Sequence, residues 1–165
     1  MSFETLYETH KDLVFNLCLH YVPNREDATE LTQEVFVKVH RHLPAFRGES
    51  GHKTWIYRIA IRTCLDFLRS RKRRQRWRVS LGGDSQPQVA DFDHPGVQLE
   101  QQEALAAIFA LIDALPERQK TALILSRLEH KIQREVAEIM GLHEKAVESL
   151  LHRARTRLRE QLKQK

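Results

Sequence analysis

Apolar residues recur at intervals of three and four along nearly the whole chain. This spacing places them on one face of a helix, and no alternating strand pattern of useful length is present. Pro23 and Pro44 interrupt the pattern, since proline cannot continue a helix. The helices predicted in this way cover about residues 3–21, 24–43, 52–74, 97–115, 116–129, 133–140 and 144–162. We therefore expect an all-α fold.

One segment, residues 79–96, lacks this helical pattern. It holds three of the six glycines, two of the five prolines and three aspartates, with no lysine or arginine. Such a composition is typical of turns and flexible connections. The sequence therefore predicts two small helical domains, residues 1–78 and 97–165, joined by an acidic flexible linker at 79–96.

Residues 133–152, QREVAEIMGLHEKAVESLLH, fit a helix-turn-helix motif. Two short helices can cross steeply only if the residue at the crossing is small and the turn residue accepts a positive φ. Ala137 and Gly141 meet these two requirements. The apolar contacts between the helices are predicted to come from Val136, Met140, Leu142, Val147 and Leu150.

In such a motif the second helix enters the major groove, with its outward residues near the base edges. Glutamate can accept from the cytosine amino group and lysine can donate to guanine, so this helix can read sequence. The base-reading residues predicted here are His143, Glu144, Lys145, Glu148, Ser149 and His152. Phosphate contacts are predicted for Lys131, Arg134, Arg153 and Arg155, with Arg157 and Arg159 beyond. The alternative is that these arginines only solvate the end of a helix.

The distribution of charge along the chain says more about binding of nucleic acid than the formal net charge of +5 does. Residues 41–78 and 117–165 are basic, whereas residues 1–40 and 79–116 are acidic. Basic segments suit a polyanionic partner, and acidic segments are repelled by one. This distribution is typical of two modules that bind nucleic acid and are separated by a segment that does not.

Other classes of protein find little support in the sequence. No apolar run is long enough for a membrane span and the first residues lack the pattern of a signal peptide, so we expect a cytoplasmic protein without membrane insertion. Cys18 and Cys64 lie in apolar helical patterns and are expected to be buried thiols. Possible ligand clusters (His40 and His42 with His52, or His10 with His20) lack the spacing of a metal or catalytic site. We expect no cofactor, no metal and no enzyme activity.

Two stretches together resemble the sigma-70 superfamily of RNA polymerase sigma factors, in its extracytoplasmic-function group. Residues 27–74, DATELTQEVFVKVHRHLPAFRGESGHKTWIYRIAIRTCLDFLRSRKRR, resemble conserved region two. Residues 115–162, LPERQKTALILSRLEHKIQREVAEIMGLHEKAVESLLHRARTRLREQL, resemble region four. The two stretches cover about three fifths of the chain, and their order with a short linker between them is specific to this group.

This resemblance implies partners and roles for particular residues. Core RNA polymerase would be bound through the clamp helices of its largest subunit and through its flap, and an anti-sigma factor would restrain the chain. The residues implied in docking on the clamp are Asp27, Glu30, Gln33, Glu34 and Phe36. Those implied in recognition of the minus-ten element are Phe46, Arg47, Gly48, Glu49, Ser50, Lys53, Thr54, Trp55, Tyr57, Arg58 and Arg62. Aromatic side chains next to basic ones suit a surface that receives unstacked bases, although Trp55 and Tyr57 could equally belong to a core.

The chain departs from the family pattern around the helix-turn-helix. His130, Lys131 and Ile132 replace a run that more often reads Gly-Leu-Ser or Gly-Leu-Thr, and His143 replaces a serine or threonine. Glu148 and Leu150 stand where many members carry lysine or arginine. A stand-alone helix-turn-helix regulator remains the alternative, because it would use the same crossing geometry. Such a regulator would bind a symmetric operator tightly without polymerase, whereas a sigma factor needs core polymerase for strong promoter binding.

Overall fold

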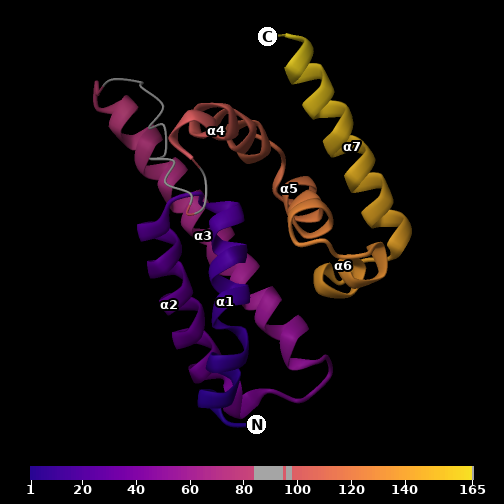
Figure 1. Cartoon of the computed structure of the whole chain (residues 1–165). Coiled ribbons are helices and arrows are strands. Elements are labelled where there is room, and N and C mark those ends of the chain that lie inside the picture. Colours follow the sequence, from indigo (N-terminus) through magenta and orange to yellow (C-terminus); the bar gives the residue numbers. More distant parts are fainter. Residues whose placement is uncertain (84–94, 96–97, 165) are drawn as a thin grey trace. The chain divides into compact units, whose positions relative to one another are not determined.

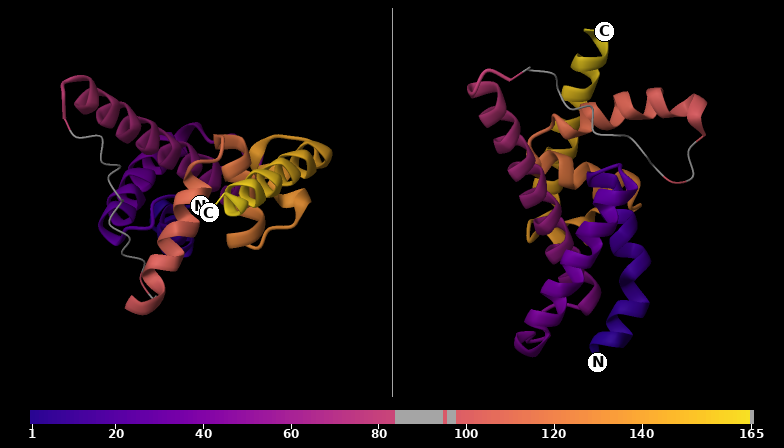
Figure 2. Two further views of the ribbon diagram at one scale, coloured as in Figure 1. Left: turned by 90° about the horizontal axis from the view of Figure 1, so that it is seen from above. Right: turned by 90° about the vertical axis from the view of Figure 1, so that its left-hand side faces the viewer.

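The computed structural model describes residues 1–83, 95 and 98–164. Within these residues the chain forms helices and no strand (Figure 1, Figure 2). The elements are α1 (Phe3–Tyr21), α2 (Arg25–His42), η1 (Leu43–Ala45), α3 (His52–Ser80), α4 (Leu99–Asp113), α5 (Glu117–Leu123), η2 (Ile124–Leu128), α6 (Gln133–Met140) and α7 (Glu144–Lys163). The predicted all-α fold is confirmed. Most of the predicted linker, residues 84–94 and 96, lies outside the described residues, as do residues 97 and 165.

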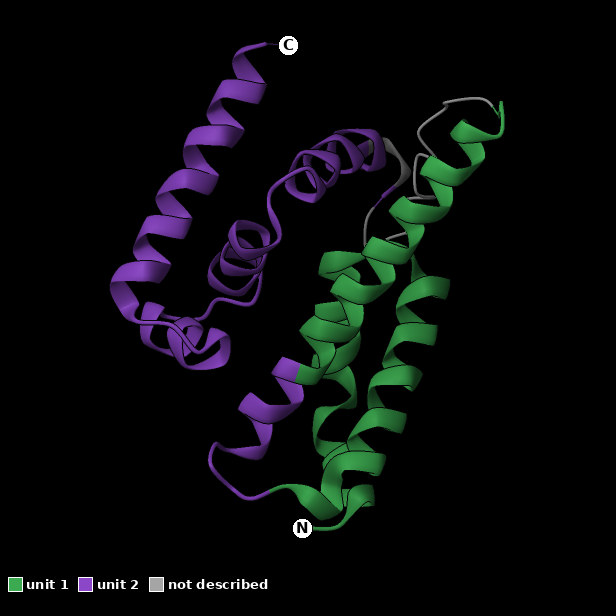
Figure 3. Cartoon of the chain, turned by 180° about the vertical axis from the view of Figure 1, so that it is seen from behind, with its two compact units in different colours: residues 1–46, 59–93 green, residues 47–58, 94–165 purple. Residues whose placement is uncertain are grey.

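The helices form two compact units (Figure 3). The first unit comprises Met1–Phe46 and Ile59–Asp93, and the second comprises Arg47–Arg58 and His94–Lys165. Helix α3 therefore contributes its first turns to the second unit and the rest of its length to the first. The division at residues 78 and 97 that we drew from the sequence stays a prediction.

The first unit is built on α1, α2 and the longer part of α3. Each of the first two helices begins at a residue whose side chain accepts a hydrogen bond from the first turn. Ser2 Oγ accepts from the backbone N–H of Thr5 at 3.2 Å, and Asn24 Oδ1 accepts from that of Asp27 at 3.0 Å. The apolar stripes that these helices bury include Leu6, Val14, Leu17, Leu31, Val35, Val39, Ala60 and Leu68.

Cys18 on α1 and Cys64 on α3 meet inside this core. Both side chains are fully buried, and their Sγ atoms lie 3.7 Å apart. The two cysteines are free thiols, which confirms the expectation from the sequence. Their contact with each other was not predicted, because nothing in the helical periodicity pairs one helix with another.

Helix α3 runs to Ser80, six residues beyond the predicted end at residue 74. Arginine, lysine and glutamine continue a helix readily, and no residue that stops one occurs before the two glycines that follow. Gly82 adopts φ +84°, and the N–H groups of Gly82 and Gly83 donate to the carbonyls of Val79 and Arg78 at 3.1 and 2.9 Å. These are the two bonds of a Schellman motif, which ends the helix here.

Other predicted helix ends also differ from the structure. Helix α4 begins at Leu99 and ends at Asp113, where 97 and 115 were predicted. Pro116 is the N-cap of α5 and not its first helical residue. Helix ends are the part of a helix that periodicity determines least, because the terminal residues contribute few buried contacts.

In the second unit, α7 packs along α5 and α6. The core between these helices is made of small and branched apolar side chains, namely Ala122, Leu123, Ile124, Leu125, Val136, Ala137, Ile139, Val147, Leu151 and Ala154. Between α5 and α6 the chain passes through the π-helical turn η2, in which Glu129 N–H donates to the carbonyl of Ile124 at 2.9 Å. This core supports α6 and α7 at the surface.

Candidate nucleic-acid interface

The turn between α6 and α7 has the geometry that a helix-turn-helix requires. Gly141 lies in the left-handed region at φ 66° and ψ 36°. The backbone N–H of Leu142 donates to the carbonyl of Ala137 at 2.9 Å, and the backbone N–H of Gly141 donates to the carbonyl of Glu138 at 3.3 Å. These bonds satisfy the last carbonyls of α6 while the chain reverses. The predicted role of Gly141 is confirmed.

Burial agrees with the predicted contacts between the two helices at Val136, Ala137 and Val147. Val136 and Val147 are fully buried, and Ala137 is buried at the crossing. On α7 the buried leucine is Leu151, whereas Leu150 is only half-buried, so the prediction of Leu150 as a core residue is corrected. Both leucines stand at helical spacing from Val147, and only the direction of α7 over α6 selects between them. Met140 and Leu142 are half-buried.

The predicted base-reading and phosphate-binding residues of α7 are all exposed: His143, Glu144, Lys145, Glu148, Ser149, His152, Arg153 and Arg155. The three- and four-residue spacing of Lys145, Glu148, Ser149 and His152 places them on one face of the helix. Two surface hollows extend along this region. The first is lined by Arg134, Glu138, His143, Glu144 and Lys145, and the second by Glu148, Ser149, His152, Arg153 and Arg155. The structure thus brings Arg134 to the same hollow as the start of α7.

The departures from the family pattern fall at special backbone positions. His130 has φ 53°, and it is the one described residue other than glycine with a positive φ. Glycine adopts this conformation without the steric cost that a Cβ atom incurs. Ile132 and His143 occupy the N-caps of α6 and α7 without a hydrogen bond from the side chain. Glu135 Oε2 accepts from the backbone N–H of Ile132 at 3.1 Å and so supports the start of α6 from inside the helix.

The residues predicted to meet the minus-ten element fall in both units. Phe46 and Arg62 belong to the first unit, and the remaining residues to the second. Arg47, Gly48, Glu49, Lys53, Arg58 and Arg62 are exposed, whereas Phe46, Ser50, Thr54 and Trp55 are half-buried. Tyr57 is buried at 2% exposure, and its hydroxyl donates to Glu129 Oε2 at 3.0 Å. Burial, followed by the charge of Glu129, raises the pKa of Tyr57 above its ordinary value.

The predicted polymerase-binding residues lie on α2. Glu30, Gln33 and Glu34 are exposed and Asp27 is half-buried. Phe36 is only 4% exposed, and the centre of its ring lies 4.8 Å from the centre of the Tyr7 ring on α1. Its position thus holds α1 against α2 and does not offer the ring to a partner.

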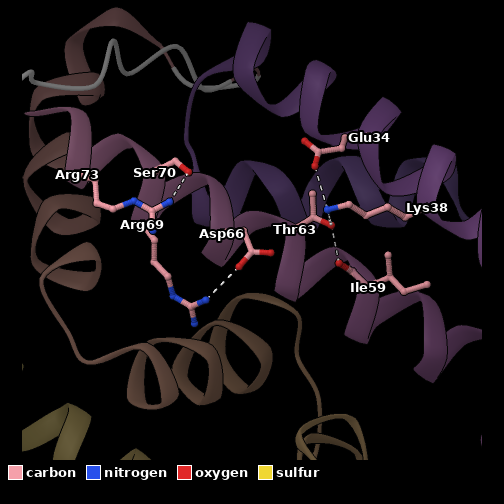
Figure 4. A network of polar contacts seen from close by, with 8 residues as sticks. All are labelled: Glu34, Lys38, Ile59, Thr63, Asp66, Arg69, Ser70 and Arg73. Carbon is pink, nitrogen blue, oxygen red and sulfur yellow. Dashed lines mark hydrogen bonds and ion pairs between the residues drawn. The ribbon is translucent and has the colours of Figure 1, made fainter.

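Glu34 is part of a short chain of polar contacts between α2 and α3 (Figure 4). Its Oε1 atom lies 2.9 Å from Nζ of Lys38, which donates to Thr63 Oγ1 at 3.1 Å. Thr63 is buried and donates in turn to the carbonyl of Ile59 at 2.8 Å. Lys38 is thereby fixed, and the carboxylate of Glu34 is held at the surface of the helix.

Neither a membrane-spanning helix nor a metal cluster is found among the described residues. None of the helices described is both long and apolar enough to cross a membrane. Among the same residues, no cluster of three or more histidine, cysteine, aspartate or glutamate side chains could hold a metal ion.

Comparison with known proteins gives matches over both halves of the chain. Residues 6–74 match the family model of sigma-70 region 2, and residues 105–158 match that of sigma-70 region 4. The extracytoplasmic-function RNA polymerase sigma-E factor of Haemophilus influenzae is 34% identical over 93% of this chain and 84% of its own length. RNA polymerase sigma-H factor of Pseudomonas aeruginosa is 30% identical over 93% of this chain and 82% of its own.

Solved structures share the fold. The sigma factor RpoE of Bartonella quintana, solved with the anti-sigma factor NepR, matches with a TM-score of 0.69 and 22% identity over 98% of this chain and 96% of its own. CnrH, solved with the cytosolic domain of CnrY, gives a TM-score of 0.66 and 19% identity over 98% of this chain and 87% of its own.

A helix-turn-helix alone would suit many DNA-binding regulators, but a region 2 match over residues 6–74 is not expected of a stand-alone regulator. The identity to sigma factors extends over nearly the whole chain and includes both regions in the same order. The chain therefore belongs to the sigma-70 family, as an RNA polymerase sigma factor of the extracytoplasmic-function group that acts in transcription initiation and is not an enzyme.

Proposed function

We propose that α7 reads the upstream promoter element, near position minus thirty-five, through the outward residues of its first three turns. The observation that supports this is the exposure of Lys145, Glu148, Ser149 and His152 on one face. Lysine and glutamate discriminate between guanine and cytosine in the major groove. Arg134, Arg153 and Arg155, which line the same two hollows, would contact phosphates and fix the position of the helix.

We further propose that α2 binds the clamp helices of the largest polymerase subunit. Glu30 and Glu34 are exposed, and the segment that holds them is acidic. An acidic helix is complementary to a basic partner and would speed association with it. Phe36 would contribute by keeping α2 packed on α1, since its ring is buried. The domain that contains the helix-turn-helix of α6 and α7 would contact the polymerase flap.

The minus-ten element is assigned to the segment from Phe46 to Arg58 together with Arg62. Lys53, Arg58 and Arg62 offer positive charge, and Trp55 and Tyr57 offer aromatic rings close to it in sequence. A base that leaves the duplex regains part of the lost stacking energy on such a ring. We propose that these residues capture the opened strand once polymerase is bound.

Reconstitution tests the proposed function directly. The purified chain is mixed with core RNA polymerase, and run-off transcription is measured over fragments of bacterial genomic DNA. We expect transcripts from a limited set of promoters that neither core polymerase nor the chain alone produces. The free chain should bind duplex promoter DNA weakly. Tight, symmetric operator binding in the absence of polymerase would instead favour a stand-alone regulator.

An anti-sigma factor is proposed as a second partner. The structural neighbour from Bartonella quintana is a sigma factor solved in complex with such a protein. In this chain an anti-sigma factor would hold the protein away from polymerase in the cytoplasm, and its release would allow the holoenzyme to associate with the nucleoid. Such a protein should abolish run-off transcription when it is added before core polymerase, and should do so less when it is added afterwards.

A further inference from the structure

Helix α3 continues well beyond the core of the first unit. Its last buried residue is Leu68, and none of residues 69–83 is buried. This end of the helix extends past the ends of α1 and α2, which belong to the same unit (Figure 3). We call residues 69–80 the α3 tail. Packing within the unit does not explain why the helix continues through this tail.

The α3 tail is strongly basic. Seven of its twelve residues are lysine or arginine, and none is aspartate or glutamate. Asp66, which precedes the tail, pairs with Arg69 at 3.0 Å. Further along, Lys72 and Arg76 stand four positions apart, and like charges at this spacing destabilise an isolated helix. A polyanion bound along the tail would offset this repulsion.

One face of the tail combines positive charge with an exposed aromatic ring. Trp77 is 68% exposed. Arg73 and Arg74 precede it by four and three positions, which places the three side chains on one side of the helix. Nη2 of Arg73 donates to Ser70 Oγ at 3.1 Å, and this contact holds the guanidinium group along the same face (Figure 4).

This face fits the sugar-phosphate backbone of nucleic acid. Guanidinium groups donate to phosphate oxygens, and the indole of Trp77 offers a flat apolar ring together with a single N–H donor. A helix that lies on a lipid surface instead has its apolar side chains on one stripe. Val79, the next exposed apolar residue, is two positions from Trp77 and therefore points to a different side.

The length of α3 indicates which part of the promoter the tail can reach. Arg62, assigned to the minus-ten element, lies on the same helix and in the same unit as Trp77. The fifteen positions between them span about 22 Å at 1.5 Å per residue. Neighbouring base pairs are about 3.4 Å apart, so this length corresponds to about six base pairs. DNA opens from the minus-ten element toward the start of transcription, and the duplex within reach of the tail is therefore on the upstream side.

We propose that the α3 tail binds the backbone of duplex DNA about six base pairs upstream of the minus-ten element, through Arg73, Arg74 and Trp77. The inference rests on the proposed function, because that function places Arg62 at the minus-ten element. The two arginines donate to phosphates, and the indole packs on a neighbouring sugar. Contacts of this kind carry no sequence information, and they fix the duplex between the two promoter elements in position.

The salt dependence of promoter binding tests the contact. Arg73→Gln with Arg74→Gln is compared with Lys72→Gln with Arg76→Gln, which removes the same charge from another exposed face of the same tail. Holoenzyme affinity is measured for a promoter that run-off transcription has identified. We expect the first pair to weaken binding about tenfold and to reduce the slope of log affinity against log salt by about 2, since each phosphate contributes about 0.9. Equal effects of the two pairs would show a general effect of charge and would overturn the inference.

Uncharged DNA locates the contact on the promoter. Methylphosphonate linkages replace the phosphates about four to eight base pairs upstream of the minus-ten element, around the distance that the helix length gives. Wild-type holoenzyme should bind this DNA about tenfold more weakly, whereas the Arg73→Gln, Arg74→Gln variant should lose no further affinity. An equal loss in both proteins would mean that other residues contact these phosphates, and the inference would be wrong.

Trp77→Ala tests the ring separately from the charge. It should weaken binding to the natural promoter about threefold and leave the salt slope unchanged, because no cation is removed. Unchanged affinity would overturn the role given to the ring.

Binding to core polymerase without DNA separates the remaining outcomes. The Arg73→Gln, Arg74→Gln variant should bind core polymerase as the wild type does. A loss of polymerase affinity equal to its loss of promoter affinity would show that the tail contacts polymerase, and the inference would be wrong. Failure of the proposed function would appear differently, as absence of promoter-directed transcripts from the wild-type holoenzyme, and it would remove the basis of the inference as well.

Discussion

The Nζ atom of Lys120 on α5 lies 3.0 Å from Oδ1 of Asp113 at the end of α4, and the lysine side chain is 2% exposed. A buried ammonium group is costly unless it is paired, since it has lost the water that solvated it. The carboxylate of Asp113 offsets part of this cost. The pair thereby ties α4 to α5 across the Leu115 and Pro116 connection.

Asp113→Ala should destabilise the second unit. Loss of Asp113 removes a partner of the buried ammonium group of Lys120, and loss of one partner costs about 3–5 kcal/mol in a fully buried pair. Because the side chain of Asp113 is 36% exposed, we expect a smaller loss of about 2 kcal/mol in the free energy of unfolding. Urea denaturation followed by circular dichroism measures it. Lys120→Met is the control, since it removes the charge itself, and it should cost less than Asp113→Ala. The reverse order would contradict the role given to the pair.

His130→Gly should stabilise the protein, because glycine adopts the observed φ of 53° without a clash between Cβ and the backbone. The gain is expected to be about 1 kcal/mol, after the extra entropy of glycine in the unfolded chain is allowed for. Thermal unfolding of the two variants His130→Gly and His130→Ala checks this. Alanine retains the Cβ atom, so it should give no gain. A similar shift in both would mean that the histidine ring, and not the backbone, is the source of strain.

Stability should fall as the pH rises above about 8.5, the ordinary pKa of a cysteine thiol. Contact with the Cys18 thiol, together with burial, raises the pKa of Cys64 well above this value. The folded protein then keeps a proton that the unfolded chain loses, and so the free energy of the unfolded state falls relative to that of the folded state as the pH increases. The slope of unfolding free energy between about pH 8 and 10 should be smaller in Cys64→Ala. Equal slopes would show that Cys64 does not titrate differently in the two states.

Glu34→Lys should weaken binding to core RNA polymerase about tenfold at low salt, because it reverses a charge on the proposed docking helix. The variant also places a second ammonium group next to Lys38, which Glu34 contacts at 2.9 Å. Asp66→Lys is a matched control. It breaks the ion pair with Arg69, and Asp66 has the same side-chain exposure as Glu34, 54%. If both variants lose polymerase affinity equally in a fluorescence binding assay, the docking assignment is wrong.

Lys145→Ala and Glu148→Ala should change which promoters the holoenzyme uses. Each lost base contact should cost about 1–3 kcal/mol at the sequences that the side chain recognises, and less at others. Arg153→Ala should instead weaken all promoters by a similar factor and reduce the dependence of binding on salt. Run-off transcription over a set of upstream sequence variants distinguishes the two kinds of effect. Identical profiles for the three variants would remove the distinction between residues that read bases and residues that bind phosphate.

The sequence alone was sufficient for several features that depend on local backbone preference. The spacing of apolar residues predicted α1, α6 and α7 within one residue of their observed ends. Gly141 was predicted to take the left-handed conformation because the turn of a helix-turn-helix requires a residue that accepts a positive φ. These features depend only on residues that are close together in the sequence, and so they can be predicted from a short segment of it.

Burial and pairing between distant residues were decided only by the tertiary structure. Periodicity could not choose between Leu150 and Leu151, and it gave no reason to bury Lys120. Tyr57 and Glu129 are 72 positions apart, and Cys18 and Cys64 are 46 apart, yet each pair is in contact. Each helix has an apolar stripe that the apolar stripe of any other helix could cover, with nearly the same free energy of hydrophobic burial. The packing of all the helices together determines which apolar stripes contact each other, and no single segment of the sequence determines that packing.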